Sequence, residues 1–281
     1  MKTIGFIDLY LSEWHANNYP EWIRQACEKS GDDFVVKYAW AEEDVSPVDG
    51  VTTDEWCQKY GVEKCNSIAE VCEKADYILV LAPSNPETHL RYAKEVLKYK
   101  KNTYIDKTFA PDYATAKEIF DIAKENGTKF FSSSALRYAT ELDGWDDLKA
   151  LLILGGGTNF DEYIIHQLEM LVKLYKNMPA KRVRVESQGD QFVGRVEFVD
   201  GRVATLIFSI AFGYSLCFDK GGFDTKFVHV TSDTFSGLIA DLVHFYKTGE
   251  VSFDTEQTLS VMKLREAMIK GKENLGEWID L

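Results

Sequence analysis

The chain has 281 residues, of which 45% are hydrophobic and 13% aromatic, enough for one large domain or two medium-sized ones. Its formal net charge of −13 argues against nucleic acid and anionic membrane as partners. No apolar run approaches the ~18 residues of a membrane span, and the first residues lead directly into a strand pattern without a secretory leader, which predicts a soluble cytoplasmic protein.

The first 133 residues alternate predicted strands with predicted helices. The apolar stripe of Leu90, Ala93 and Val96 marks one helix, and Asn126-Gly127 is a typical helix end. The predicted strands are residues 3–10, where the strand runs into a turn, then 34–40, 75–82, 102–106 and 128–131. Because strands alternate with helices, we expect residues 1–133 to form a Rossmann-like domain, a doubly wound parallel sheet covered by helices.

The pattern changes after residue 134. A predicted helix at 140–152 leads to the glycines 155–157, and a second helix is expected from about Glu162 to Lys176. From Lys181 onward strands follow one another, with Asp200-Gly201 as a hairpin turn, and two helices close the chain. We therefore expect residues 134–281 to form an α+β domain with a mainly antiparallel sheet, used for substrate binding and self-association.

The turn after the first strand lacks the glycines of a dinucleotide-binding motif. In G-x-G-x-x-G the glycines allow the backbone to approach a pyrophosphate closely, whereas this chain has Asp8, Tyr10 and Glu13 near those positions. A carboxylate at Asp8 would repel the pyrophosphate, and Tyr10 would add bulk. The following His15-Ala16-Asn17 either lines a remodelled pocket or caps the first helix.

The second strand ends at Trp40, where a dinucleotide-binding domain usually carries an acid that binds the adenosine ribose. Acids follow only at residues 42–44, and their charge disfavours the additional phosphate of NADP. If a dinucleotide binds, the sequence favours NAD over NADP.

Lys107 follows the fourth strand at its carboxyl end, where open parallel sheets bind ligands. A lysine beside Asp106 can exchange a proton with a substrate oxygen. The alternative is an ordinary surface lysine at the end of a strand.

The segments 83–89 and 104–108 resemble the Gfo/Idh/MocA oxidoreductase family. In that family the third strand ends in a proline turn followed by a histidine, and the fourth strand ends in Glu-Lys-Pro. In this chain Asp106 replaces the glutamate of Glu-Lys-Pro, Thr108 replaces its proline, and Lys107 retains its lysine. The glycines 155–157, the segment 161–166 and residues 238–250 extend the resemblance. It implies a dinucleotide site formed by Asp8, Tyr10, Trp40, Pro83, Asn85, His89 and Asp106.

The resemblance implies an oxidoreductase that moves hydride between NAD or NADP and a sugar, polyol or related hydroxy compound. Lys107 would be the main acid and base, and His166 would assist it, oriented by Glu162 or by Asp161. Glu162 and His166 share a helix face at a spacing of four residues, which suits proton transfer. The alternatives are a solvated helix face or, with Glu169, a zinc site; the family itself implies no metal.

Two further readings of function stay open beside the dehydrogenase. One is a protein on this scaffold that does not use free NAD(P), either as an enzyme with another ligand or as a binding protein. The other is a non-catalytic partner subunit. In each case we expect a small-molecule ligand and a homo-oligomer formed through the C-terminal sheet. The five cysteines form no C-x-x-C pair, so they predict a reducing compartment and no zinc site.

Overall fold

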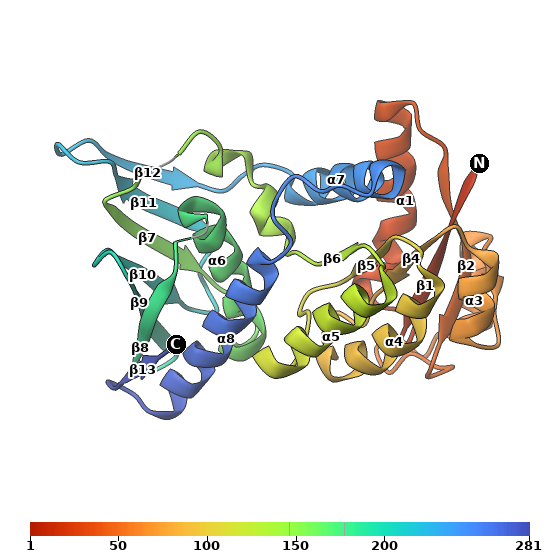
Figure 1. Ribbon diagram of the computed structural model, residues 1–281, viewed down its shortest axis with the longest axis horizontal. Coiled ribbons are helices and arrows are strands. Elements are labelled where there is room, and N and C mark those ends of the chain that lie inside the picture. The colour runs from red at the N-terminus through yellow and green to blue at the C-terminus, as the bar shows by residue number, and fades with distance from the viewer. Residues whose placement is uncertain (146, 177) are drawn as a thin grey trace. The chain divides into compact units, whose positions relative to one another are not determined.

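The computed structural model describes the chain of 281 residues except residues 146 and 177 (Figure 1). It divides into two compact units. The first comprises Met1–Ser133 and Leu238–Thr255, and the second comprises Ser134–Gly237 and Glu256–Leu281. The sequence-based division assigned all of 134–281 to the second domain, whereas Leu238–Thr255 lies with the first unit.

The first unit contains a six-stranded sheet in the order β3-β2-β1-β4-β5-β6, and its registered pairs are all parallel. Its strands are β1 Lys2–Asp8, β2 Phe34–Ala41, β3 Glu63–Lys64, β4 Tyr77–Val80, β5 Thr103–Ile105 and β6 Phe130–Phe131. Ile4, Phe6 and Ile7 of β1 are fully buried, as expected for a strand with both faces covered. The predicted Rossmann-like sheet is confirmed, and the strand order reverses direction between β1 and β4.

Helices cover both faces of this sheet, with α4 and α5 on one side and α1 and α7 on the other (Figure 1). The helices of the unit are α1 Trp14–Ser30, α2 Thr53–Tyr60, α3 Ile68–Lys74, α4 His89–Val96, α5 Tyr113–Asn126, the 3₁₀ turns Pro86–Thr88 and Leu97–Tyr99, and α7 Thr234–Thr248 from its residue Leu238 onward. Gly127 ends α5 in the left-handed region at φ 67°, as predicted. Tyr246 of α7 donates a 2.8 Å hydrogen bond to the Ile78 carbonyl, and Phe245 packs on Phe131. This hydrogen bond and this aromatic contact explain why α7 from Leu238 onward joins the first unit.

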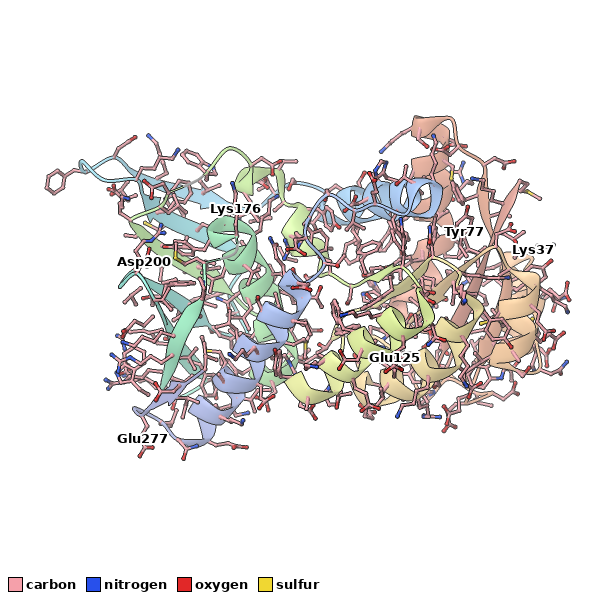
Figure 2. All side chains as sticks on the ribbon, in the orientation of Figure 1. Lys37, Tyr77, Glu125, Lys176, Asp200 and Glu277 are labelled. Carbon is pink, nitrogen blue, oxygen red and sulfur yellow. The ribbon has the colours of Figure 1, made fainter. Side chains whose placement is uncertain are left out.

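The second unit contains a seven-stranded sheet in the order β12-β11-β7-β10-β9-β8-β13. Its strands are β7 Ala150–Gly155, β8 Ala180–Gln188, β9 Gln191–Phe198, β10 Val203–Phe208, β11 Ser215–Asp219, β12 Thr225–His229 and β13 Trp278–Asp280; its helices are α6 Phe160–Tyr175, α8 Gln257–Glu273 and the 3₁₀ turns Ala135–Tyr138 and Thr140–Leu142. The predicted hairpin at Asp200-Gly201 joins β9 to β10 (Figure 2). The pairs in this sheet are antiparallel except β7 with β10, which confirms a mainly antiparallel second sheet.

The predicted helix at 140–152 is wrong, although residue 146 lies outside the described residues. Only Thr140–Leu142 forms a 3₁₀ turn, and strand β7 begins at Ala150. Leu151 and Ile153 are buried while Leu152 and Leu154 are half-buried. This two-residue alternation lets β7 pair with β10 and β11, and the pairing outweighs the helix propensity of the leucines.

Candidate functional site

Asp8 ends β1 beside the point where the strand order reverses, which is where sheets of this kind bind ligands. Its Oδ1 atom accepts hydrogen bonds from the backbone N–H groups of Leu9, at 2.7 Å, and of Ala82 just beyond β4, at 3.0 Å. The side chain is buried, with 1% of the residue exposed. The carboxyl group of Asp8 therefore links the turns that follow two neighbouring strands.

The second carboxyl oxygen of Asp8 lacks the hydrogen bonds that the first one makes. Oδ2 is buried and has no hydrogen-bond partner among the described residues. Burial raises the pKa of Asp8 well above its ordinary value, and the nearby Glu13 carboxylate raises it further. The turn after β1 thus carries a buried carboxyl group where a dinucleotide-binding turn needs room for phosphate.

Glu13 is the N-cap residue of α1, and its carboxylate binds the first backbone N–H groups of that helix. One oxygen accepts from the His15 N–H at 2.7 Å, and the other contacts the Ala16 N–H. Glu13 is buried, and burial raises its pKa, against the opposing effect of His15. The N-terminus of α1, the favoured position for a pyrophosphate, is occupied by a carboxylate of the chain itself.

Asp106 follows β5 and holds His15 from the opposite direction. The Oδ2 atom of Asp106 contacts Nδ1 of His15, and both residues are buried. Its Oδ1 atom accepts from the Tyr104 hydroxyl at 3.0 Å and from the Lys107 backbone N–H at 2.8 Å. Burial alone would raise the pKa of Asp106, but the charge and contact of His15, together with Lys107, bring the pKa below its ordinary value. Asp106 therefore positions both His15 and the backbone of Lys107.

Lys107 lies at the carboxyl edge of the sheet, as the sequence predicts, and its side chain is half-buried. The next residue, Thr108, donates its backbone N–H to the Pro83 carbonyl at 3.2 Å. The structure thus brings together two of the predicted segments, the turn after β4 and the turn after β5. The proposed roles of Pro83 and Lys107 toward a ligand stay predictions.

His89 and Asn85 occupy structural positions in these turns. His89 is fully buried, with Nδ1 3.0 Å from the Phe109 carbonyl oxygen and Nε2 2.6 Å from the Leu81 carbonyl oxygen. Burial lowers the pKa of His89. Asn85 donates its backbone N–H to the Ala82 carbonyl and its side-chain amide to Glu87. Both ring nitrogens of His89 face the protein backbone, so its described contacts stabilise the two turns.

The adenosine side of the predicted site consists of Trp40 and the residues after it. The half-buried Trp40 packs edge-to-face on Tyr92. Glu42, the first acid after β2, accepts a 2.6 Å hydrogen bond from the Tyr92 hydroxyl and pairs with Arg91. Tyr10 lies half-buried, and burial followed by the charges of Asp8 and Glu13 raises its pKa. Glu42, the first acid after β2, is thus already bound by Tyr92 and Arg91.

In the second unit, His166 lies on α6 and has a defined orientation. Its Nδ1 atom is 2.6 Å from the Ser134 hydroxyl. Glu162 lies in the first turn of α6, where Asn159 caps the helix and donates its side-chain amide to the Glu162 carboxylate at 3.2 Å. Asp161 pairs with Lys272 at 2.6 Å. Both acids therefore contribute to the start of α6, one turn before His166.

Glu169 is buried, contrary to the polar helix face expected from the sequence. Its carboxylate pairs with the buried Arg137 at 2.8 Å and accepts the Ser134 backbone N–H at 3.2 Å. In the described part of the chain, no group of three or more His, Cys, Asp or Glu side chains could hold a metal ion. The zinc alternative on Glu162, His166 and Glu169 is therefore not supported by the arrangement.

A dinucleotide would need free backbone N–H groups and space at the turn after β1. The Glu13 carboxylate takes the N–H groups of His15 and Ala16, and Asp8 takes those of Leu9 and Ala82. The residues at this turn therefore do not fit the pyrophosphate of NAD or NADP. Sequence reasoning identified Asp8 but missed that His15 binds Asp106, because the two lie 91 positions apart.

Comparison with known proteins supports the family resemblance. Residues 43–134 match the model described as "Oxidoreductase family, NAD-binding Rossmann fold" (GFO_IDH_MocA). An uncharacterized oxidoreductase of Escherichia coli, YhhX, is 37% identical over 62 residues, which is 22% of this chain and 18% of that relative. The resemblance to the Gfo/Idh/MocA oxidoreductases is confirmed, and the match begins after the altered turn and α1.

Solved structures share the fold over nearly the whole chain. A probable dehydrogenase from Thermotoga maritima has a TM-score of 0.76 at 15% identity, covering 99% of this chain and 98% of that one. The WlbA dehydrogenase of Bordetella pertussis, solved in complex with NADH and UDP-GlcNAcA, has a TM-score of 0.71 at 14% identity, covering 100% and 99%. At these identities the likeness establishes the fold. No helix among the described residues is long and apolar enough to cross a membrane.

Proposed function

We propose that this relative of the Gfo/Idh/MocA oxidoreductase family acts on a sugar, a polyol or a related hydroxy compound, with Lys107 exchanging a proton with the substrate oxygen. The family-model match supports the class of activity. Relatives of the same fold, such as the UDP-N-acetylglucosamine 3-dehydrogenase GnnA of Acidithiobacillus ferrooxidans, support a carbohydrate-type substrate. We also propose a cytoplasmic location, which the acidic net charge of −13 fits.

The observation that carries the proposal is the anchoring of Lys107. Its backbone N–H donates to Asp106, a buried carboxylate that Tyr104 and His15 hold in turn. The residue therefore leaves the sheet edge in a fixed backbone position, while its half-buried side chain retains access to a ligand. A lysine ammonium can hydrogen-bond to a substrate hydroxyl and exchange a proton with it during oxidation or reduction at carbon.

His166 is proposed to assist Lys107 from the second unit. The Ser134 hydroxyl at Nδ1 fixes the ring orientation. A positioned imidazole can relay a proton near neutral pH. Glu162 or Asp161 would orient the turn of α6 that carries His166, through the contacts of Glu162 with Asn159 and of Asp161 with Lys272.

The family's redox partner is a nicotinamide dinucleotide, which supplies the hydride donor or acceptor when it binds. We favour NAD over NADP, because residues 42–44 are acidic and would repel an additional phosphate. The contacts of Asp8 and Glu13 do not fit the pyrophosphate, so the roles proposed for Lys107 and His166 concern only the proton on the substrate oxygen.

The poor fit between the turn after β1 and a pyrophosphate favours a second candidate function. A protein on this scaffold that does not use free NAD(P) would be an enzyme with another ligand, a binding protein or a partner subunit. Its supporting observation is the pair of buried acids, Asp8 and Glu13, at the turn after β1. We also propose that the chain forms a homo-oligomer through the second sheet, on which Leu152, Leu154 and Ile207 stay half-buried.

A substrate screen with matched lysine variants tests the main proposal. Sugars, polyols and their nucleotide derivatives are first screened for thermal stabilisation of the protein, and those that stabilise it are assayed for turnover with NAD(P) and, separately, with an artificial electron acceptor. Lys107→Met is expected to reduce turnover by about 100-fold or more, in line with the loss of a general acid or base. Lys98→Met, at an exposed position of the same unit, is the control. Full turnover in Lys107→Met would reject the proposed role.

A further inference from the structure

We propose that Glu13 replaces the cofactor's pyrophosphate at the N-terminus of α1, so that a free dinucleotide cannot bind there in the manner usual for this fold. The inference concerns cofactor binding and does not rest on the role assigned to Lys107. It follows from the contacts of Glu13 and Asp8 and from the position of α1 after β1.

A helix N-terminus attracts an anion because its first backbone N–H groups lack partners within the helix and because the helix dipole is positive there. In α1 that anion is already present. The Glu13 carboxylate accepts from the N–H groups of both His15 and Ala16, and the residue is only 8% exposed. A pyrophosphate would have to displace a carboxylate bound through two charge-assisted hydrogen bonds.

Asp8 occupies the remaining backbone N–H groups at which a pyrophosphate would bind, those of the turns after β1 and β4. Its Oδ1 atom binds the N–H groups of Leu9 and Ala82, which follow β1 and β4. These are the two strands between which the sheet order reverses, the usual place for a dinucleotide. The side chain thus occupies the space that glycine leaves open in the usual motif.

The electrostatics of the buried acids also disfavour a pyrophosphate at this turn. The Glu13 carboxylate raises the pKa of Asp8, and the Asp106 carboxylate adds to that effect, so the three acids lie close enough to interact. Burial and this mutual repulsion raise the pKa of Asp8 and of Glu13, so the place already disfavours negative charge. A pyrophosphate would bring two further negative charges to the same place, and like charges at short range are repelled.

The test measures cofactor binding to the whole chain by calorimetry, with NAD, NADH, NADP and NADPH. Wild type is expected to show no binding at up to about 1 mM cofactor. The variant Asp8→Gly/Tyr10→Gly/Glu13→Gly, which introduces glycine at the three motif positions, is expected to gain affinity by about tenfold or more. The control is Asp112→Gly, which removes the acidic N-cap of α5 in the same unit and should leave cofactor binding unchanged.

A second readout identifies where any cofactor binds. The backbone amide signals of His15 and Ala16 are followed by NMR during titration of wild type with NADH. The inference predicts that these signals do not move, even if the cofactor binds elsewhere on the chain. Micromolar binding that shifts both amides would overturn it.

The glycine variant can also overturn the inference. If it is folded by circular dichroism and still fails to bind, then Glu13 and Asp8 are not what excludes the cofactor. If it does not fold, the amide titration of wild type decides the question alone. Neither result depends on turnover, so a failed substrate screen would leave this inference standing.

Discussion

The Nδ1 atom of His15, in the first turn of α1, contacts the Oδ2 atom of Asp106, the residue that follows β5. Both side chains are buried, and the ring of His15 also packs against Trp14 and Tyr19. Asp106 binds the Lys107 backbone as well. The first turn of α1 is thereby connected, through Asp106, to Lys107.

Asp106→Ala is expected to destabilise the protein by about 1–3 kcal/mol, because it leaves the Lys107 N–H without its acceptor and the buried His15 ring without its carboxylate partner. Turnover should fall as well, since the position of Lys107 is no longer fixed. Urea unfolding monitored by circular dichroism gives the first quantity. Asp121→Ala, on the exposed face of α5, should change stability by less than about 0.5 kcal/mol. Equal losses in both variants would contradict the prediction.

The buried Asp8 should make stability fall as pH rises. Its pKa in the folded protein lies above the ordinary value, so between these two values the folded state binds more protons than the unfolded state. The stabilising contribution is complete below pH ~3.8 and is lost as pH rises through the folded-state pKa. Asp8→Asn should therefore be the more stable protein at pH 8, by on the order of 1 kcal/mol.

The measurement for Asp8 is the free energy of unfolding at several pH values, in wild type and in Asp8→Asn. Glu125→Gln is the control, because Glu125 is exposed on α5 (Figure 2). A wild-type advantage over Asp8→Asn that grows between pH 5 and pH 8 would contradict the prediction.

His89 should have the opposite dependence on pH. Burial lowers its pKa, so the folded state binds fewer protons than the unfolded state below the ordinary value of ~6.5. The contribution of His89 is complete above that value and is lost as pH falls through it. Thermal melting of wild type and His89→Gln should show a difference that narrows from pH 8 to pH 5.5. If the difference in melting temperature widened from pH 8 to pH 5.5, the proposed effect of His89 on stability would be wrong.

The ion pair between Arg137 and Glu169 should be costly to break. Both side chains are buried, so Glu169→Gln or Arg137→Met leaves a buried charge without its partner. Each single change should cost about 3–5 kcal/mol, while Arg137→Met/Glu169→Leu should cost less than the sum of the single changes. Denaturant unfolding of the three variants in a double-mutant cycle provides the check. Additive losses would show that the pair is not coupled.

Self-association through the second sheet can be tested at Ile207. This half-buried residue lies opposite Val193 and Leu154 on neighbouring strands, which makes a continuous apolar surface. Ile207→Glu should convert an oligomer into ~32 kDa particles in light scattering, because charges are depleted from interface cores. Val199→Glu, exposed beside the hairpin turn, should leave the particle size unchanged. A wild type that is itself monomeric would reject the interface.

The sequence by itself determined the classes of the two sheets. Strands followed by helices predict parallel pairing, and the run of strands around Asp200-Gly201 predicts antiparallel pairing, because both patterns are local. The sequence also determined that Lys107 follows a strand at its carboxyl end and that the motif glycines are missing. The segment 140–152 misled prediction because its leucines favour a helix locally, whereas pairing with β10 and β11 makes residues from Ala150 onward a strand.

The tertiary structure alone decided what the altered turn does. Glu13 binds backbone groups two and three residues away, but Asp8 is fixed by Ala82 and His15 by Asp106, each from a distant part of the chain. The fold also placed α7 on the first unit and buried Glu169 against Arg137. Burial and long-range contacts set the charge and the availability of a side chain, and neither is encoded in the spacing of neighbouring residues.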